Sequence, residues 1–304
     1  MQLLLLILLV LVFLATMLVA GNNLSACIGP AVGSRILTKR FGMLLGAIGF
    51  STGLLVQGSY MIKSVTTLLP NATSMLRAEA MLVAVVVFVF AYKIRAPMSL
   101  SMSLVGLLAG LSIAGESPAN SLFVLEVVLT WVIVPIASFA LAFYLIRFLT
   151  RDWPGNFWRR LQEYKVLLIV LSFFSAYVTG ANTLGLIVAV GGFDIYAILA
   201  ALVAIFIGSF FLSEGAIRRV SQELFLMRYA NATATLLTST FLMEIATLFN
   251  IPLSITQATS TAVFGIGVSY KTKFVTSKPF LKIIAAWIIV PLSSFAIGIL
   301  IGYT

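Results

Sequence analysis

The chain has 304 residues, of which 61% are hydrophobic and only 9% are charged, and its net charge is +10. Soluble domains carry about 25% charged residues, so this composition excludes a water-soluble, disordered or nucleic-acid-binding protein. It indicates a polytopic membrane protein embedded in the lipid bilayer. The single cysteine, Cys27, excludes an internal disulfide, and the lack of histidine removes the commonest general base and zinc ligand.

Residues 1–20 form the first predicted span, because twenty apolar residues cover the roughly 30 Å hydrocarbon core of a bilayer. No lysine or arginine precedes Arg35, so the segment lacks the basic region of a cleaved signal peptide. We therefore expect a retained helix whose N-terminus faces outward.

Nine further apolar blocks give ten predicted crossings in all. They cover residues 41–60, 81–92, 96–115, 120–146, 166–180, 194–213, 229–249, 252–270 and 280–302. With the N-terminus outside, every basic residue except Lys63 and Arg77 falls in a loop on the inner side. Such asymmetry is what the positive-inside rule predicts for the correct orientation. We expect both termini outside the cell membrane.

The chain repeats itself. Residues 131–140 read WVIVPIASFA and residues 287–296 read WIIVPLSSFA, 156 residues further on. The segment PMSLS that starts at Pro97 recurs as PLSIT at Pro252. We predict an all-α membrane protein built from two inverted-topology repeats of about five helices each. The N-terminal repeat covers 1–150, a cytoplasmic linker covers 151–164, and the C-terminal repeat covers 165–304. The linker is either an amphipathic segment at the inner interface or a solvated connection. Inverted repeats are a recurring architecture of secondary transporters, although a channel can share it.

Polar and glycine-rich stretches interrupt the apolar blocks at corresponding places in both halves. The first pair covers 21–34 and 180–192, where we expect a re-entrant hairpin or a broken helix. The second pair covers 96–106 and 251–265, where proline stands beside closely spaced serine and threonine. Hydroxyl groups and free N–H groups at half-helix ends bind anions, and hydroxyl oxygens also ligate Na⁺. Alternatively, the small residues only pack helices closely.

These motifs resemble those of the PiT family of inorganic phosphate transporters. Asn22–Asn23 and Asn182–Thr183 are similar to the Asn-Asp pair of its GANDVANA-type motif, and VGSRILT at 32–38 is similar to the segment that follows. The proline motifs resemble its P-V-S-T-T-H segments. The resemblance implies phosphate uptake coupled to Na⁺ or H⁺ at a site between the halves, with no other cofactor, and it makes a homodimer plausible.

Together, the motifs and the resemblance identify the candidate side chains for the substrate or the coupling ion. They are Asn22, Asn23, Ser25, Ser99, Ser101, Asn182, Thr183, Ser254, Thr256 and Gln257. Among them, Asn22, Asn23, Asn182 and Thr183 are the candidates for Na⁺. No other metal site is expected.

The sequence departs from the family motif where its aspartates would stand, at Asn23 and Thr183. A buried carboxylate accepts the proton that phosphate still carries at pH 7 and thereby discriminates against sulfate. Sulfate or another tetrahedral oxyanion is therefore the alternative substrate.

Only two acids, Glu126 and Glu244, fall well inside the predicted spans. An ionisable residue at membrane depth is a functional candidate, so either carboxylate is a candidate for coupling, unless it lies at the outer interface. Arg35 is a candidate for neutralising an anion, or else a topology charge.

We do not expect an enzyme, because lipid-modifying chemistry needs a base or clustered Mg²⁺ ligands, and the chain has no histidine and no paired aspartate motif. An ATP-driven pump is also not encoded, since no G-x-x-x-x-G-K-[ST] motif occurs. The sequence does not exclude a passive channel.

Overall fold

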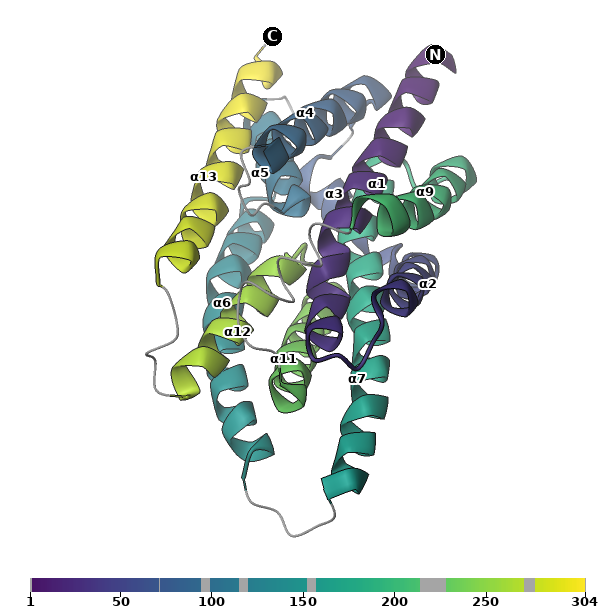
Figure 1. Cartoon of the computed structure of the whole chain (residues 1–304). Coiled ribbons are helices and arrows are strands. Elements are labelled where there is room, and N and C mark those ends of the chain that lie inside the picture. Colours follow the sequence, from purple (N-terminus) through teal and green to yellow (C-terminus); the bar gives the residue numbers. More distant parts are fainter. Residues whose placement is uncertain are drawn as a thin grey trace.

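The protein is all-helical in the part that the computed structural model describes, which comprises residues 2–70, 72–93, 99–114, 120–151, 157–213, 228–270 and 277–303 (Figure 1). Pro97 lies outside these residues. The helices are α1 (Gln2–Gly33), α2 (Lys39–Gln57), α3 (Tyr60–Leu68), α4 (Ser74–Lys93), α5 (Leu100–Ala114), α6 (Ser121–Leu149), α7 (Phe157–Thr179), the π-helix η1 (Gly180–Leu184), α8 (Gly185–Val190), α9 (Ile195–Ile207), the π-helix η2 (Gly208–Leu212), α11 (Tyr229–Leu248), α12 (Ile255–Ser269) and α13 (Ser277–Gly302).

Six helical segments in the described ranges are long and apolar enough to cross a membrane. They are Gln2–Gly33, Lys39–Gln57, Ser121–Leu149, Trp158–Val190, Ile195–Leu212 and Ile283–Gly302. The outer face of α6 shows why a bilayer suits them, because its side chains Leu122, Val132 and Ile136 are exposed. Apolar surface of this extent is stable in contact with lipid and not with water.

The sequence predicts ten crossings, and four of the ten apolar blocks lie outside this set of six, in α4, α5, α11 and α12. Helices α5 and α12 have 15 residues each, which makes them roughly 22 Å long and too short for a bilayer core. Each packs against the helix that precedes it after a short connection, so α4–α5 and α11–α12 are helical hairpins. Figure 1 shows α4–α5 in the half of the molecule near the chain ends and α11–α12 in the opposite half.

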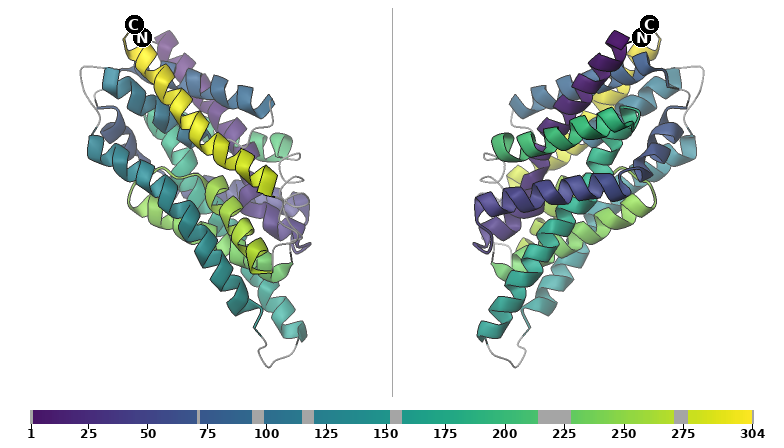
Figure 2. Two further views of the ribbon diagram at one scale, coloured as in Figure 1. Left: turned by 90° about the vertical axis from the view of Figure 1, so that its left-hand side faces the viewer. Right: turned by 90° about the vertical axis from the view of Figure 1, so that its right-hand side faces the viewer.

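Both chain ends lie at the same end of the molecule, as Figure 2 shows from two sides. The ends of α6 and α7 protrude at the opposite end, and they carry the basic residues Arg147, Arg151, Arg159 and Arg160. Four of the basic residues that the sequence predicts on the inner side therefore lie at the end of the fold opposite the chain ends.

The expected break at 21–34 is wrong. Helix α1 continues through it to Gly33, with Pro30 in its last turn, and the chain turns only at Arg35, which has a φ of 61°. Proline at this position removes one helical hydrogen bond, the one that an N–H of residue 30 would donate to the Ala26 carbonyl, and the helix ends within the same turn. In 180–192 the disturbance is milder than a hairpin: residues 180–184 form a π-helix and the span continues to Val190.

The two halves are interleaved by reciprocal contacts. Helix α5 packs on α13 while α12 packs on α6, and α1 packs on α9 while α2 packs on α7. At the first pair of contacts, a Cβ atom at Gly110 would collide with the carbonyl oxygen of Phe295, and one at Gly265 would collide with that of Phe139. Only glycine allows backbones to approach so closely.

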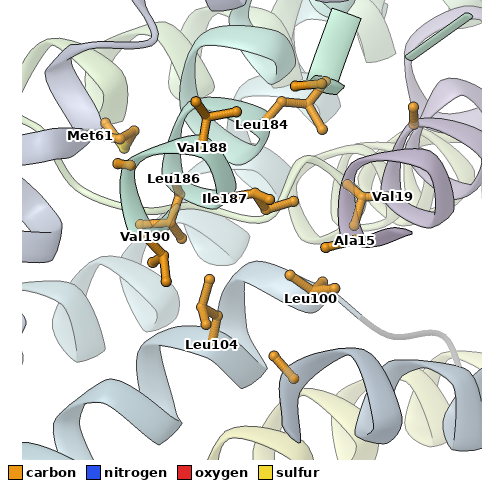
Figure 3. Packing of buried hydrophobic residues seen from close by; sticks show 14 of the residues in the cluster. Ala15, Val19, Met61, Leu100, Leu104, Leu184, Leu186, Ile187, Val188 and Val190 are labelled. Atoms are coloured by element: carbon orange, nitrogen blue, oxygen red, sulfur yellow. The ribbon is translucent and has the colours of Figure 1, made fainter. Parts of the chain in front are cut away.

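The apolar core lies where these elements meet. Leu186, Ile187 and Val190 of α8 point towards Leu100 and Leu104 of α5 (Figure 3), and all five side chains are fully or almost fully buried. This packing fixes the start of α5 beside the second half of the chain, at the place where the polar motifs lie.

Candidate functional site

The loop between α11 and α12, residues 250–254, is the centre of the candidate site. Asn182, which is fully buried in the π-helix η1, clamps this loop with its side-chain amide. Its Nδ2 donates to the Ile251 carbonyl oxygen at 2.9 Å, and its Oδ1 accepts from the Leu253 N–H at 2.9 Å. Nδ2 also donates to the Thr247 hydroxyl at 3.1 Å. The π-turn therefore aims Asn182 at the loop, and π-turns of this kind are frequent at functional sites.

Three side chains from the first half of the chain hold the same loop. Trp131 of α6 donates its indole N–H to the Pro252 carbonyl oxygen at 2.9 Å. Ser101 of α5 donates to the Leu253 carbonyl oxygen at 3.5 Å, and Ser64 of α3 donates to that of Asn250. Asn250 itself has a φ of 59°, a left-handed conformation that asparagine tolerates. The loop is thus fixed by four elements, and both halves contribute.

The clamped loop delivers the chain into the N-terminus of α12 at Ile255. The preceding Ser254 is buried, and its hydroxyl lies 2.8 Å from that of Thr256. The first N–H groups of a helix lack helical acceptors and carry a partial positive charge. A buried helix start flanked by two hydroxyl groups is suited to bind an anion.

The start of α5 repeats this arrangement. Ser99 and Ser101 are buried, and their hydroxyls lie 2.7 Å apart. The hydrogen bond from Ser101 to the Leu253 carbonyl places this second helix start against the loop that precedes α12. Two helix N-termini and two hydroxyl pairs therefore come together in the interior.

Two further candidate side chains are buried with an oxygen that has no hydrogen-bond partner among the described residues. They are Thr183, through its hydroxyl, and Gln257, through its amide oxygen. Thr183 adjoins the loop clamp Asn182, and Gln257 lies in the first turn of α12. Buried polar atoms are almost always paired, so both oxygens are free to contact a ligand.

On α1, the predicted residues Asn22, Asn23 and Ser25 are partly engaged with one another. Asn22 is half-buried and donates its Nδ2 to the Asn23 Oδ1 at 3.2 Å. Ser25 is buried and donates to the Asn22 carbonyl oxygen at 2.8 Å. Helix α1 contacts α12 and η1, which brings this group to the side of the same interior region.

The two acids differ sharply. Glu126 is exposed on α6, and its carboxylate takes part in none of the contacts around the loop. Glu244 of α11 is half-buried and accepts a hydrogen bond from the Nε2 of Gln57 at 2.9 Å. Arg35 is exposed at the turn after α1 and is not at the loop.

Sequence reasoning did not find Gln57, Ser64 or Thr247, and it used Trp131 only as a marker of the repeat. Each of the first three contacts a residue far away in the chain or one turn away on a helix, so no local motif announces it. A tryptophan four residues before a proline in both halves, in WVIVP and WIIVP, was the one available signal.

No group of three or more cysteine or acidic side chains occurs in the described part of the chain. The candidate site offers neutral oxygens from amides and hydroxyls, which are hard ligands suited to Na⁺ and to hydrogen-bonding an anion.

Comparison with known proteins decides the family. A model of the phosphate transporter family matches residues 19–186 and 156–298. The chain belongs to this phosphate transporter family. The predicted resemblance is therefore confirmed.

Relatives within reach of sequence comparison cover nearly the whole chain. It is 25% identical over 299 residues to the sulfate permease CysP of Bacillus subtilis, covering 93% of this chain and 83% of that protein. It is 26% identical over 301 residues to the putative phosphate permease MJ0630 of Methanocaldococcus jannaschii, covering 97% and 95%.

The fold matches that of a solved sodium-dependent phosphate transporter. The TM-score is 0.86 at 17% identity, and the match covers 100% of this chain and 98% of the other. At this identity the match establishes the all-helical transporter fold that the sequence predicts.

Proposed function

We propose that the protein is a secondary transporter that imports inorganic phosphate across the cell membrane by alternating access, coupled to Na⁺ or H⁺. The observation that carries the proposal is the pair of helix starts at Leu100 and Ile255, which meet at a loop clamped from both halves. Membership of the phosphate transporter family supports the substrate class.

The reciprocal contacts support two inverted repeats, residues 1–150 and 165–304, joined by the linker 151–164. Each half contributes three of the six candidate spans and one hairpin. Three is odd, so the second half enters the membrane upside down relative to the first. An odd number of candidate spans in each half supports the inversion predicted from the sequence.

The position of the site between the two halves supports alternating access. Trp131 and Ser101 of one half and Asn182 of the other bond the same loop. A rocking motion of one half against the other changes which side of the membrane reaches a site at their interface. Clamps from both halves keep the loop in place while the surroundings move.

Phosphate is the first substrate, with Ser99, Ser101, Ser254, Thr256 and Gln257 as its hydrogen-bonding groups. Sulfate is the second candidate, because Asn23 and Thr183 stand where the family motif has aspartate. Among the described residues around the loop, no carboxylate stands in for those two to accept the proton of phosphate, and the CysP relative is named a sulfate permease. Both anions share the tetrahedral shape that helix N-termini bind.

Na⁺ or H⁺ is the coupling ion. The neutral oxygens of Asn22, Asn23, Asn182 and Thr183 are one candidate site for Na⁺ and Glu244 is another, and the structural neighbour is described as sodium-dependent. The amide of Asn182 is already used by the loop, so Thr183 offers the freer oxygen of that pair. The orientation with both termini outside follows from the basic end of the fold. A homodimer remains part of the proposal through the family.

The test is uptake of ³²P-phosphate by proteoliposomes under imposed Na⁺ or pH gradients, with excess sulfate as competitor. Uptake that depends on a gradient and ignores sulfate is the expected result. If excess sulfate abolishes the uptake, sulfate becomes the proposed substrate in place of phosphate. If neither anion is taken up, the proposal is refuted.

A further inference from the structure

Glu244, Thr240 and Gln57 form a polar cluster apart from the loop site. Gln57 is buried at the end of α2 and donates its Nε2 to Oε1 of Glu244 at 2.9 Å. The second carboxylate oxygen, Oε2, is buried and has no hydrogen-bond partner within the described ranges. Gln57 therefore fixes the carboxylate and leaves one of its oxygens unused.

Thr240 supplies a second unused oxygen on the same face of α11. It precedes Glu244 by four residues, so the two side chains are neighbours on the helix surface. Thr240 is 9% exposed, and its hydroxyl has no partner in the part of the chain that the structure describes. A carboxylate oxygen and a hydroxyl oxygen, both buried and both without a hydrogen-bond partner among the described residues, thus belong to side chains one turn apart on α11.

The hydroxyl of Thr240 is one of two threonine hydroxyls of α11, with that of Thr238, that have no hydrogen-bond partner among the described residues. Three other threonines of α11 donate to the carbonyl one turn back: Thr233 at 2.9 Å, Thr235 at 2.9 Å and Thr247 at 2.8 Å. This bond is the ordinary way to satisfy a hydroxyl in an apolar helix. Thr240 does not make it, so its oxygen is available to another ligand.

The apolar surroundings of Glu244 make a carboxylate without a partner energetically unfavourable. Phe241, Ile245 and Leu248 form the exposed apolar face of α11 beside Glu244, and a charged carboxylate at membrane depth needs a compensating cation or partner. Within the described residues no lysine or arginine forms an ion pair with Glu244. A hard monovalent cation satisfies both unused oxygens at once.

We propose that Glu244 and Thr240, with Gln57 orienting the carboxylate, bind Na⁺, and that this cation is the coupling ion. The second part rests on the proposed transport function. Helix α11 connects this cation site to the loop at residues 250–254. Glu244 lies one turn before Thr247, whose hydroxyl accepts the hydrogen bond from Asn182. Binding of Na⁺ stabilises the turn that positions Asn182 and hence the loop at the start of α12.

The first test is binding of ²²Na⁺ to the purified full-length protein by scintillation proximity, with no anion present. We expect saturable binding by the wild type. Glu244→Gln and Thr240→Val should weaken it by about tenfold or more, the effect of losing a metal ligand or its support. Thr240→Ser keeps the oxygen and should bind nearly as the wild type does.

Two matched controls separate ligation from general damage. Thr235→Val removes a hydroxyl from the same helix that is already bonded, and Glu126→Gln removes a carboxylate from the exposed face of α6. Both should bind ²²Na⁺ as the wild type does. Wild-type affinity in Glu244→Gln, or no saturable binding by the wild type, would overturn the site.

Anion uptake distinguishes the two proposals. Phosphate or sulfate uptake by the wild type that is indifferent to Na⁺ would overturn the coupling role while the transport function stands. Saturable ²²Na⁺ binding that needs Glu244, in a protein that moves neither anion, would leave the cation site in place and refute the transport function.

Discussion

Replacing Asn182 by alanine should destabilise the protein much more than replacing Asn22, although the two asparagines occupy corresponding motif positions. Asn182 is fully buried and bonds the Ile251 carbonyl and the Leu253 N–H. Alanine leaves both backbone groups buried without that partner. Each such group costs about 1–3 kcal/mol, so the expected loss is about 2–6 kcal/mol, or roughly 5–15 °C in Tm.

Asn22 is the matched control. It is half-buried, and its side chain bonds only Asn23 among the described residues, at 3.2 Å. Its replacement by alanine should cost about 1 kcal/mol or less, which is roughly 3 °C. The difference in Tm between the two variants therefore reports the hydrogen bonds from Asn182 to the loop, and not a general effect of replacing an asparagine.

The chain provides its own reporter for this assay. Its single cysteine, Cys27, is fully buried, so a thiol-reactive fluorophore labels it only as the protein unfolds in detergent. Equal melting temperatures for the two variants would refute the claim that the Asn182 side chain stabilises the loop at residues 250–254. A stable Asn182→Ala variant without uptake would assign Asn182 to the ligand instead of to the loop.

Three further predictions concern the site and its packing. Ser99→Ala and Ser254→Ala should each raise the phosphate concentration for half-maximal uptake about tenfold to hundredfold, since a hydrogen bond to a charged group contributes about 1.5–3 kcal/mol; unchanged affinity would remove the hydroxyls from the site. Trp131→Phe keeps the ring but leaves the loop carbonyl unpaired, and should weaken phosphate binding about tenfold, measured by calorimetry against the wild type. Gly110→Val and Gly265→Val should lower Tm by a similar amount, roughly 3–10 °C each, because both place a side chain against a neighbouring backbone carbonyl; a large effect of only one would contradict the reciprocal packing.

The sequence predicts the helical membrane class, the repeat and the places of the polar motifs. Hydropathy and internal similarity can be read directly from the sequence, without knowledge of contacts between distant residues. The sequence predicts ten crossings, whereas six helical segments in the described ranges are long and apolar enough to cross a membrane. Hydropathy measures how apolar a segment is and not whether it returns to the side it came from. Helices α5 and α12 are apolar enough but too short, and they pair with α4 and α11 instead.

The predicted break at 21–34 failed for a related reason. Glycine and asparagine weaken a helix in isolation, yet packing against neighbouring helices keeps α1 continuous to Gly33. In the second half the same kind of sequence gives only a π-turn at 180–184. Tertiary contacts decide between these outcomes, and single-sequence patterns do not contain them.

The candidate site residues also fall into two groups, those in local sequence motifs and those that meet only through contacts between distant parts of the chain. Ser99, Ser101, Ser254 and Thr256 were recognisable because they repeat beside proline. The bond between Gln57 and Glu244 joins residues 187 positions apart, and nothing local to either one indicates the other.

The central claim is that anion moves through a site exposed to one side of the membrane at a time, and counterflow tests it most directly. Proteoliposomes are loaded with unlabelled phosphate, diluted, and given a trace of ³²P-phosphate outside. A carrier exchanges the label against the internal pool, so transient accumulation well above equilibrium is the predicted result, and it should be lost in a Ser99→Ala, Ser254→Ala double variant. Entry of label at the same rate with or without internal phosphate would indicate a pore and contradict alternating access.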